Sequence, residues 1–172
     1  LFAAWVNLHS TVQVGLLVLA AHLAGRAIEI VARDRRIAIA EIVRDTAIRH
    51  WFWLILAASA GVLLNPSGPG AVLDGLRMAA NPNLRSVSEW LPPSAASLGG
   101  RTFALSWGLL VVILRVSRRR IRPVESILLA VFSVAVLQSS RMILWYVPIY
   151  LYCVLPHAAE ILQRAWPAAP PR

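Results

Sequence analysis

A short polar stretch in the middle of the chain, "NPNLRSVSEWLPPS" (residues 81–94), contains side chains that can do chemistry. The carboxylate of Glu89 can act as a base, contact a substrate or pair with a nearby arginine. Arg85 in the same stretch and Arg141 farther along the chain are the arginines considered for that pair. An ion pair, a substrate or cofactor contact and direct catalysis are therefore all open as roles of Glu89.

Further polar side chains stand next to apolar runs. Asn7 and His9 lie in "WVNLHS", and Asn65 opens "NPSG". His9 is suited to capping a helix or to contacting a phosphate or a sugar. Arg141 ends the motif "QSSR" and can either hold a phosphate through two parallel hydrogen bonds or extend its charge to the membrane surface. A metal site needs several ligands at close spacing, which His9 lacks, so we predict no metal.

The composition around these motifs is that of a membrane protein. The chain has 172 residues, of which 58% are hydrophobic and 15% charged, and its mean hydropathy is +0.65. Soluble domains average about 45–50% apolar and about 25% charged residues. We therefore predict an all-α fold, a polytopic transmembrane helical bundle. The chain has no phosphate-binding glycine loop and no cysteine–histidine zinc pattern, so we predict no cofactor.

Apolar runs and their interruptions predict about five membrane spans. The segment between the first two spans, residues 33–50, has apolar residues at helical spacing and predicts an amphipathic, interfacial helix. Residues 65–101 predict a long connection rich in proline, glycine, serine and asparagine, with one short helix at 70–80. The predicted spans are residues 11–32, 47–64, 102–116, 124–138 and 142–162.

Arginines predict the orientation of the spans. All 17 basic residues are arginine, and they concentrate in the connections at residues 26–49 and 115–122. Positive connections stay in the cytoplasm, which places residues 65–101 and the corner at 138–141 outside. The formal net charge of +9 fits anchoring to anionic lipid headgroups, and nothing else in the sequence supports nucleic-acid binding.

Two features bear on how the chain is organised. Cys153 is the single cysteine and lies in an apolar run, so we predict a small core residue rather than a disulfide or a metal ligand. The first residues, "LFAAWV", lack a basic region and a cleavage site and so make a poor signal peptide. We expect residues 1–172 to form one transmembrane region that belongs to a longer protein.

Four motifs taken in order resemble a known pattern over most of residues 5–155. "WVNLHS", "NPSG", "RSVSEWLPP" and "SSRMILWYVPIYL" are similar to the C-terminal membrane region of uncharacterised bacterial proteins related to GT-C glycosyltransferases. The chain departs from that pattern at Ser10, where glycine is usual, and at Ser67, where an aromatic residue is usual. Met142 and Ile143 follow Arg141 in a looser version of the last motif.

The resemblance implies a multi-pass protein of the bacterial inner membrane that takes sugar from a polyprenyl-phosphate donor at the outer face. The catalytic acid of such enzymes lies in the first outer loop, which would precede Leu1, so no catalytic residue is expected in this segment. The residues expected to shape a pocket for lipid phosphate or sugar are Asn7, His9, Asn65, Glu89 and Arg141.

Two other function classes stay open from the sequence. A non-catalytic membrane subunit or scaffold, packing against protein partners in a larger membrane complex, fits the aromatic-rich spans equally well. A transporter needs ionisable or polar residues in mid-span, where only Gln13 and His22 come close. Membrane lipids are expected partners in each case.

Overall fold

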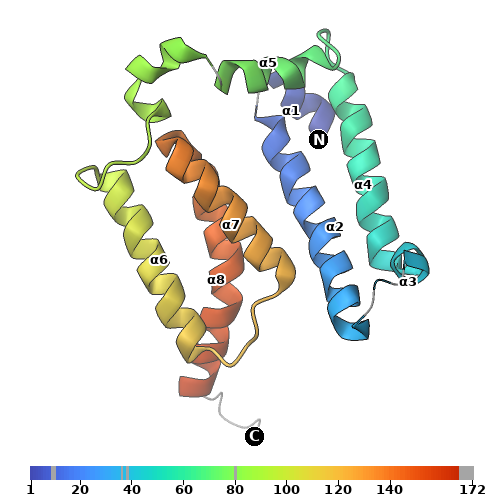
Figure 1. The fold of residues 1–172 in the computed structure, drawn as a ribbon, viewed down its shortest axis with the longest axis vertical. Helices are drawn as coiled ribbons and strands as arrows, with labels where there is room; N and C mark the ends of the chain where they lie inside the picture. The colour runs from blue at the N-terminus through green and yellow to red at the C-terminus, as the bar shows by residue number, and fades with distance from the viewer. Residues whose placement is uncertain (9–10, 36, 38, 80, 167–172) are drawn as a thin grey trace, which may run out of the picture. The chain divides into compact units, whose positions relative to one another are not determined.

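The computed structural model describes residues 1–8, 11–35, 37, 39–79 and 81–166. Throughout these residues the regular structure is helical, which confirms the predicted all-α helical bundle (Figure 1). The chain divides into two compact units, Leu1–Ser86 and Val87–Arg172, which we call unit 1 and unit 2. Each unit is described by itself.

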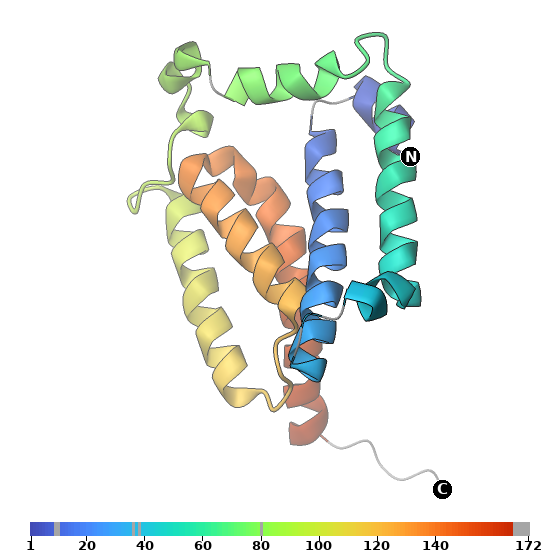
Figure 2. The same cartoon turned by 45° about the vertical axis from the view of Figure 1, so that its right-hand side comes forward.

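Unit 1 is built on two long antiparallel helices that lie side by side (Figures 1 and 2). Helix α1 packs against the end of α4, and the short α3 precedes the start of α4. The short helix expected at residues 70–80 is present as α5. The elements of unit 1 are α1 (Phe2–Leu8), α2 (Val12–Asp34), α3 (Ile39–Arg44), α4 (Thr46–Leu63), α5 (Gly70–Ala79) and the 3₁₀ turn η1 (Pro82–Ser86).

A small apolar cluster fixes α1 against α2 and α4. Val6, Val12 and Val62 are its buried members, and the rings of Phe2 and Trp5 pack around them. Helix α2 has no side chain where these rings approach it. A Cβ at Gly15 would lie 2.8 Å from the Trp5 ring and 2.9 Å from the Phe2 ring, so this approach requires glycine. The apolar face of α1 therefore closes one end of unit 1.

Asp45 interrupts the amphipathic segment expected at residues 33–50. Helix α3 is only six residues long, and Asp45 then takes an extended conformation (φ −64°, ψ 126°) and caps α4. Its Oδ1 accepts a hydrogen bond of 3.0 Å from the Ile48 backbone N–H, and its Oδ2 accepts one of 2.7 Å from Arg26 Nη2. The amphipathic helix is thus shorter than expected, because a carboxylate that satisfies the free N–H groups of a new helix starts that helix at Thr46.

Unit 2 is a three-helix bundle preceded by a turn. Helices α6 and α7 run in opposite directions, and α8 packs against both (Figures 1 and 2). Ser97 caps α6 by accepting a hydrogen bond of 3.0 Å from the Gly100 N–H, so α6 begins earlier than the span expected at residues 102–116. The elements are η2 (Ser88–Trp90), α6 (Leu98–Val116), α7 (Pro123–Gln138), η3 (Ser140–Met142) and α8 (Ile143–Ala165).

The core of unit 2 lies between α7 and α8 and includes polar groups with partners. Phe132 and Leu128 of α7 are almost completely buried. Tyr146 and Tyr150 of α8 are buried as well, and both hydroxyls bond to α6. The Tyr146 hydroxyl lies 2.8 Å from the Ser106 hydroxyl, and the Tyr150 hydroxyl donates to the Ser106 carbonyl oxygen at 2.9 Å. These two tyrosines therefore join α8 to α6 within the bundle.

The long helices have the length and composition of membrane spans. Four segments, α2, α4, α6 and Ser140–Ala165, are long and apolar enough to cross a membrane, and α7 is a shorter apolar helix. Large apolar side chains are exposed along them, for example Trp53 of α4 and Leu105 of α6. Such exposure is unfavourable in water but normal against lipid tails. The chain is therefore a multi-pass integral membrane protein.

The cap at Asp45 predicts a loss of stability that depends on pH. Its hydrogen bonds to Arg26 and to the Ile48 N–H lower the pKa of Asp45 from 3.8 to about 2. Replacing Asp45 with alanine should decrease the free energy of unfolding in detergent by about 2 kcal/mol at pH 7, since it removes a helix cap and a half-buried ion pair. A depressed pKa contributes stability above the unfolded value, so the difference from wild type should shrink as pH falls from 3.8 towards about 2.

Asp74→Ala is the control for this measurement. Asp74 pairs with Arg77 at 3.4 Å, and both side chains are mostly exposed. An exposed pair contributes little, so this variant should lose less than about 0.5 kcal/mol. Equal losses for the two variants, or a difference for Asp45→Ala that stays constant down to pH 2, would contradict the role assigned to Asp45.

Candidate functional site

Hydrogen bonds join the "SEW" turn of η2 to the corner between α7 and α8. The hydroxyls of Ser139 and Ser140 each donate to the Glu89 carbonyl oxygen at 3.0 Å. The Ser140 N–H also donates to the Leu91 carbonyl oxygen at 2.9 Å. Two motifs about 50 residues apart in sequence therefore form one surface. We call it the corner surface and define it by Glu89, Trp90, Ser139, Ser140 and Arg141.

Arg141 packs on an aromatic ring within the corner surface. Its Cζ lies 5.2 Å from the centre of the Trp90 ring, a distance typical of a cation–π contact. The expected alternative, an ion pair between Arg141 and Glu89, is not formed. Both side chains are exposed, and among the side chains that the structure describes none forms an ion pair with the Glu89 carboxylate. The corner surface thus presents a cation and an anion that do not neutralise each other.

The chemistry open to this surface follows from these two groups. The Arg141 guanidinium has five N–H donors, and the N–H groups of a guanidinium bind phosphate or carboxylate oxygens. The carboxylate of Glu89 accepts hydrogen bonds, for which sugar hydroxyls are suitable donors. The surface is therefore suited to an oxygen-rich, partly anionic ligand.

The side chains of Asn7 and Asn65 hold the backbone of unit 1 together. Asn7 Nδ2 donates to the carbonyl oxygens of Ala3 at 2.7 Å and Leu64 at 3.0 Å. Asn65 Nδ2 donates to the Val6 carbonyl oxygen at 3.3 Å and to Asn7 Oδ1 at 3.2 Å. An amide nitrogen has two hydrogens, so these bonds use both donors of each residue.

The five residues expected to share a pocket are thus distributed over two units. Asn7 and Asn65 meet in unit 1, and Glu89 and Arg141 share the corner surface of unit 2. His9 lies outside the described residues. A single pocket formed by all five stays a prediction.

Glu125 is not among the residues predicted from the sequence to form a site, yet among the described residues of unit 2 it has the largest set of charged partners. This carboxylate is 0% exposed at the first turn of α7. Its Oε1 accepts hydrogen bonds from Arg119 Nη2 at 2.8 Å and Arg122 Nε at 3.1 Å, and its Oε2 accepts one from the Arg122 backbone N–H at 2.8 Å. His157 Nε2 lies 3.6 Å from Oε2 and has no hydrogen bond within the described structure.

This cluster ties the arginine-rich connection to the bundle. Ser117 at the end of α6 contacts His157 of α8, with 3.1 Å between Oγ and Nδ1. The two arginines that contact Glu125 belong to the connection between α6 and α7. The group fits no metal site, since the described residues contain no set of three or more potential His, Cys, Asp or Glu ligands. Its role is structural: it neutralises a carboxylate that α7 buries.

The sequence contains a pattern that could have identified Glu125 as part of this cluster. Glu125 stands two residues after Pro123 and three after Arg122, the place where an acidic side chain closes the first turn of a helix. What the spacing does not reveal is burial, because burial depends on α8 covering the turn. Cys153 of α8 contributes to that cover, as the small buried residue that the sequence predicts.

Comparison of the chain with models of protein families, with curated proteins and with solved structures gave no match. The resemblance to GT-C-related proteins therefore rests on the four sequence motifs.

Replacing Glu125 with glutamine tests the structural role of the cluster. At this buried position an amide has one acceptor oxygen fewer, carries no charge and turns an N–H₂ group towards the guanidiniums of Arg119 and Arg122, which are 33% and 46% exposed. We expect a loss of about 2 kcal/mol in the free energy of unfolding, measured by tryptophan fluorescence in detergent, because hydrogen bonds to a charged group are lost. The matched control is Glu160→Gln, which alters a carboxylate that accepts from the Arg118 N–H at 3.1 Å but is 29% exposed. A control loss as large as that of Glu125→Gln would refute the special role of burial.

Proposed function

We propose that the chain is the lipid-phosphate-binding membrane part of a GT-C-like glycosyltransferase in a bacterial inner membrane. The corner surface is the site at which it holds the phosphate of a polyprenyl-phosphate sugar. The observation that carries the proposal is the Arg141–Trp90 contact beside a Glu89 carboxylate that forms no ion pair with any described side chain. In the orientation that the arginine distribution predicts, this surface faces outward, where such donors are used.

Each group of the corner surface has a defined part in this proposal. Arg141 binds the phosphate and steadies its negative charge as the sugar leaves, an electrostatic contribution that is strongest where water is scarce. Glu89 accepts a hydrogen bond from a sugar hydroxyl. Ser139 and Ser140 act as positioning residues, because their hydroxyls fix the η2 backbone. The base that activates the acceptor comes from elsewhere in the protein.

Unit 1 has a supporting part in the same proposal. Asn7 and Asn65 position the backbone at the end of α4, since the donors of both amides are already used. His9 stays a candidate for direct contact with phosphate or sugar. His9 is therefore the residue of unit 1 that we propose for direct contact with the ligand.

One observation favours a second candidate, a non-catalytic membrane subunit. Helix α6 exposes large apolar side chains on much of its surface, including Leu105, Val111 and Val112. Such a surface suits a neighbouring transmembrane helix of a partner as well as it suits lipid. In this alternative the corner surface holds a partner protein rather than a lipid-linked sugar.

The test is binding of polyprenyl phosphate to the purified full chain in nanodiscs, with the uncharged polyprenol as reference. Arg141→Gln should weaken polyprenyl phosphate binding about tenfold, because it removes charge-assisted hydrogen bonds, and should leave polyprenol binding unchanged. Arg101→Gln is the control: Arg101 is also an exposed arginine of unit 2, but its Nε donates to the Ala95 carbonyl oxygen.

Three results would overturn the proposal. Equal binding of polyprenyl phosphate and polyprenol would show that the chain has no site for the phosphate. Equal weakening by Arg141→Gln and Arg101→Gln would show a general effect of charge. Loss of a co-purifying partner protein from Arg141→Gln, with lipid binding intact, would support the subunit alternative instead.

A further inference from the structure

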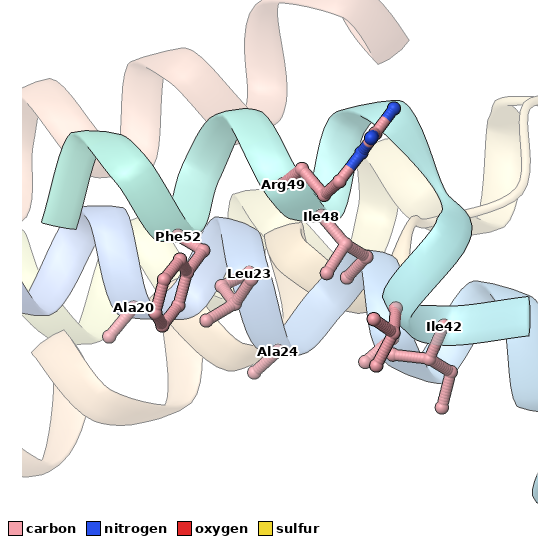
Figure 3. Close-up of a pocket in the computed structure, with 9 residues that line it drawn as sticks. Ala20, Leu23, Ala24, Ile42, Ile48, Arg49 and Phe52 are labelled. Atoms are coloured by element: carbon pink, nitrogen blue, oxygen red, sulfur yellow. The ribbon is translucent and has the colours of Figure 1, made fainter. Parts of the chain in front are cut away.

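An apolar groove lies among α2, α3 and α4 of unit 1 (Figure 3). Its volume is about 570 Å³, within the range of about 300–1,000 Å³ that is usual for ligand sites. A single residue of its lining, Arg49, carries a charge. The lining residues are Ala20, Leu23, Ala24, Ala27, Ile42, Val43, Ile48, Arg49 and Phe52.

The hollow arises from the sizes of the side chains on two facing helices. Ala20, Ala24 and Ala27 follow the spacing that puts residues on one face of α2, and each has only a methyl group. Larger side chains from α4 and α3, such as Phe52 and Ile42, form the walls. The small side chains of α2 therefore leave a hollow between the larger side chains of α3 and α4.

The groove is expected to face hydrocarbon rather than water. Both α2 and α4 have the length and composition of membrane spans, and the groove runs along them. An apolar space of this size left empty forfeits the dispersion contacts of its lining atoms, and water gains no hydrogen bonds there. The chemistry that fills it best is an alkyl chain.

Arg49 adds a charge at one edge of the groove. Its aliphatic stem lines the space, and its guanidinium extends away from the apolar side chains (Figure 3). No carboxylate in the described part of the chain forms an ion pair with it. Arg26, by contrast, is bound by Asp45 at 2.7 Å and Glu29 at 3.1 Å. Arg49 is thus a cation without a counter-charge among the described residues. It lies in the first turns of α4, where a membrane span is expected to reach the lipid headgroups.

We propose that this groove is a binding site for an anionic membrane phospholipid, with one acyl chain in the groove and the phosphate on Arg49. The pairing of alkyl lining with a free guanidinium matches the two parts of such a lipid. The amphipathic helix α3 contributes Ile42 and Val43 to the lining and so covers the chain near the headgroup. The site shares no residue with the corner surface and does not depend on the proposed glycosyltransferase function.

The experiment is native mass spectrometry of the purified full chain, titrated with phosphatidylglycerol or with phosphatidylcholine of the same acyl chains. We expect one phosphatidylglycerol per chain to bind more tightly than phosphatidylcholine. Arg49→Gln should weaken phosphatidylglycerol binding about tenfold. Arg44→Gln, an exposed arginine of α3 outside the lining, should change it less than about twofold, as expected of a screened surface charge.

A second variant tests the groove itself. Ala24→Trp places an indole in the space, and because Ala24 is exposed to the groove the helices should still form. This variant should abolish binding of both lipids while its circular dichroism and melting temperature stay within error of wild type. If Ala24→Trp lowers the melting temperature, Ala27→Phe repeats the test at another residue of the groove lining.

The remaining outcomes overturn the proposal. Equal effects of Arg49→Gln and Arg44→Gln would show attraction to surface charge alone. Lipid binding unaffected by both filling variants would show that the groove is not occupied. Dimers of the wild-type chain that both filling variants dissociate would show that a second copy, rather than a lipid, occupies the groove. Weakening by Arg141→Gln equal to that by Arg49→Gln would place the phospholipid at the corner surface instead.

Discussion

A charge in hydrocarbon is costly, about 2.5–3.5 kcal/mol for an arginine or aspartate at the centre of a span, and this cost governs the arrangement of the chain. The arginines concentrate in connections and helix ends, and the helices between them are apolar over long stretches. Where a carboxylate is buried, as Glu125 is, two arginines and a backbone N–H reach it. The fold therefore places charged side chains at the ends of helices, or pairs them with opposite charges where they are buried.

The same cost explains why so many polar side chains serve the backbone. The ends of helices leave N–H and C=O groups without partners, and near a membrane little water replaces them. Asp45 accepts from a free N–H group at the start of α4, and Asn7 donates to the Leu64 carbonyl oxygen at its end. Ser139 and Ser140 do the same for the turn at Glu89. Polar residues that look like site residues in a greasy sequence are therefore often structural.

Against that background, charges without a partner are the informative ones. Arg141 rests on Trp90, and Arg49 lies at the edge of an apolar groove, and neither is neutralised by a described carboxylate. The first has a carboxylate and hydroxyls near it, which suits a sugar phosphate. The second lines a groove whose other lining side chains are alkyl or aromatic, which suits the tail of a phospholipid. The surroundings, rather than the guanidinium, separate the two proposed ligands.

The sequence by itself determined the class of the molecule and the approximate place of its helices. Apolar length, arginine placement and residues that break helices are local properties, so they predicted an all-α membrane bundle and the short helix at 70–80. They also marked Glu89, Arg141 and Asn65 as unusual. Only tertiary contacts decided the rest, because burial and pairing depend on residues far apart in sequence. The docking of Trp90 on Arg141, the bonding of Asn65 to Asn7 and the burial of Glu125 beneath α8 follow from packing that no local pattern encodes.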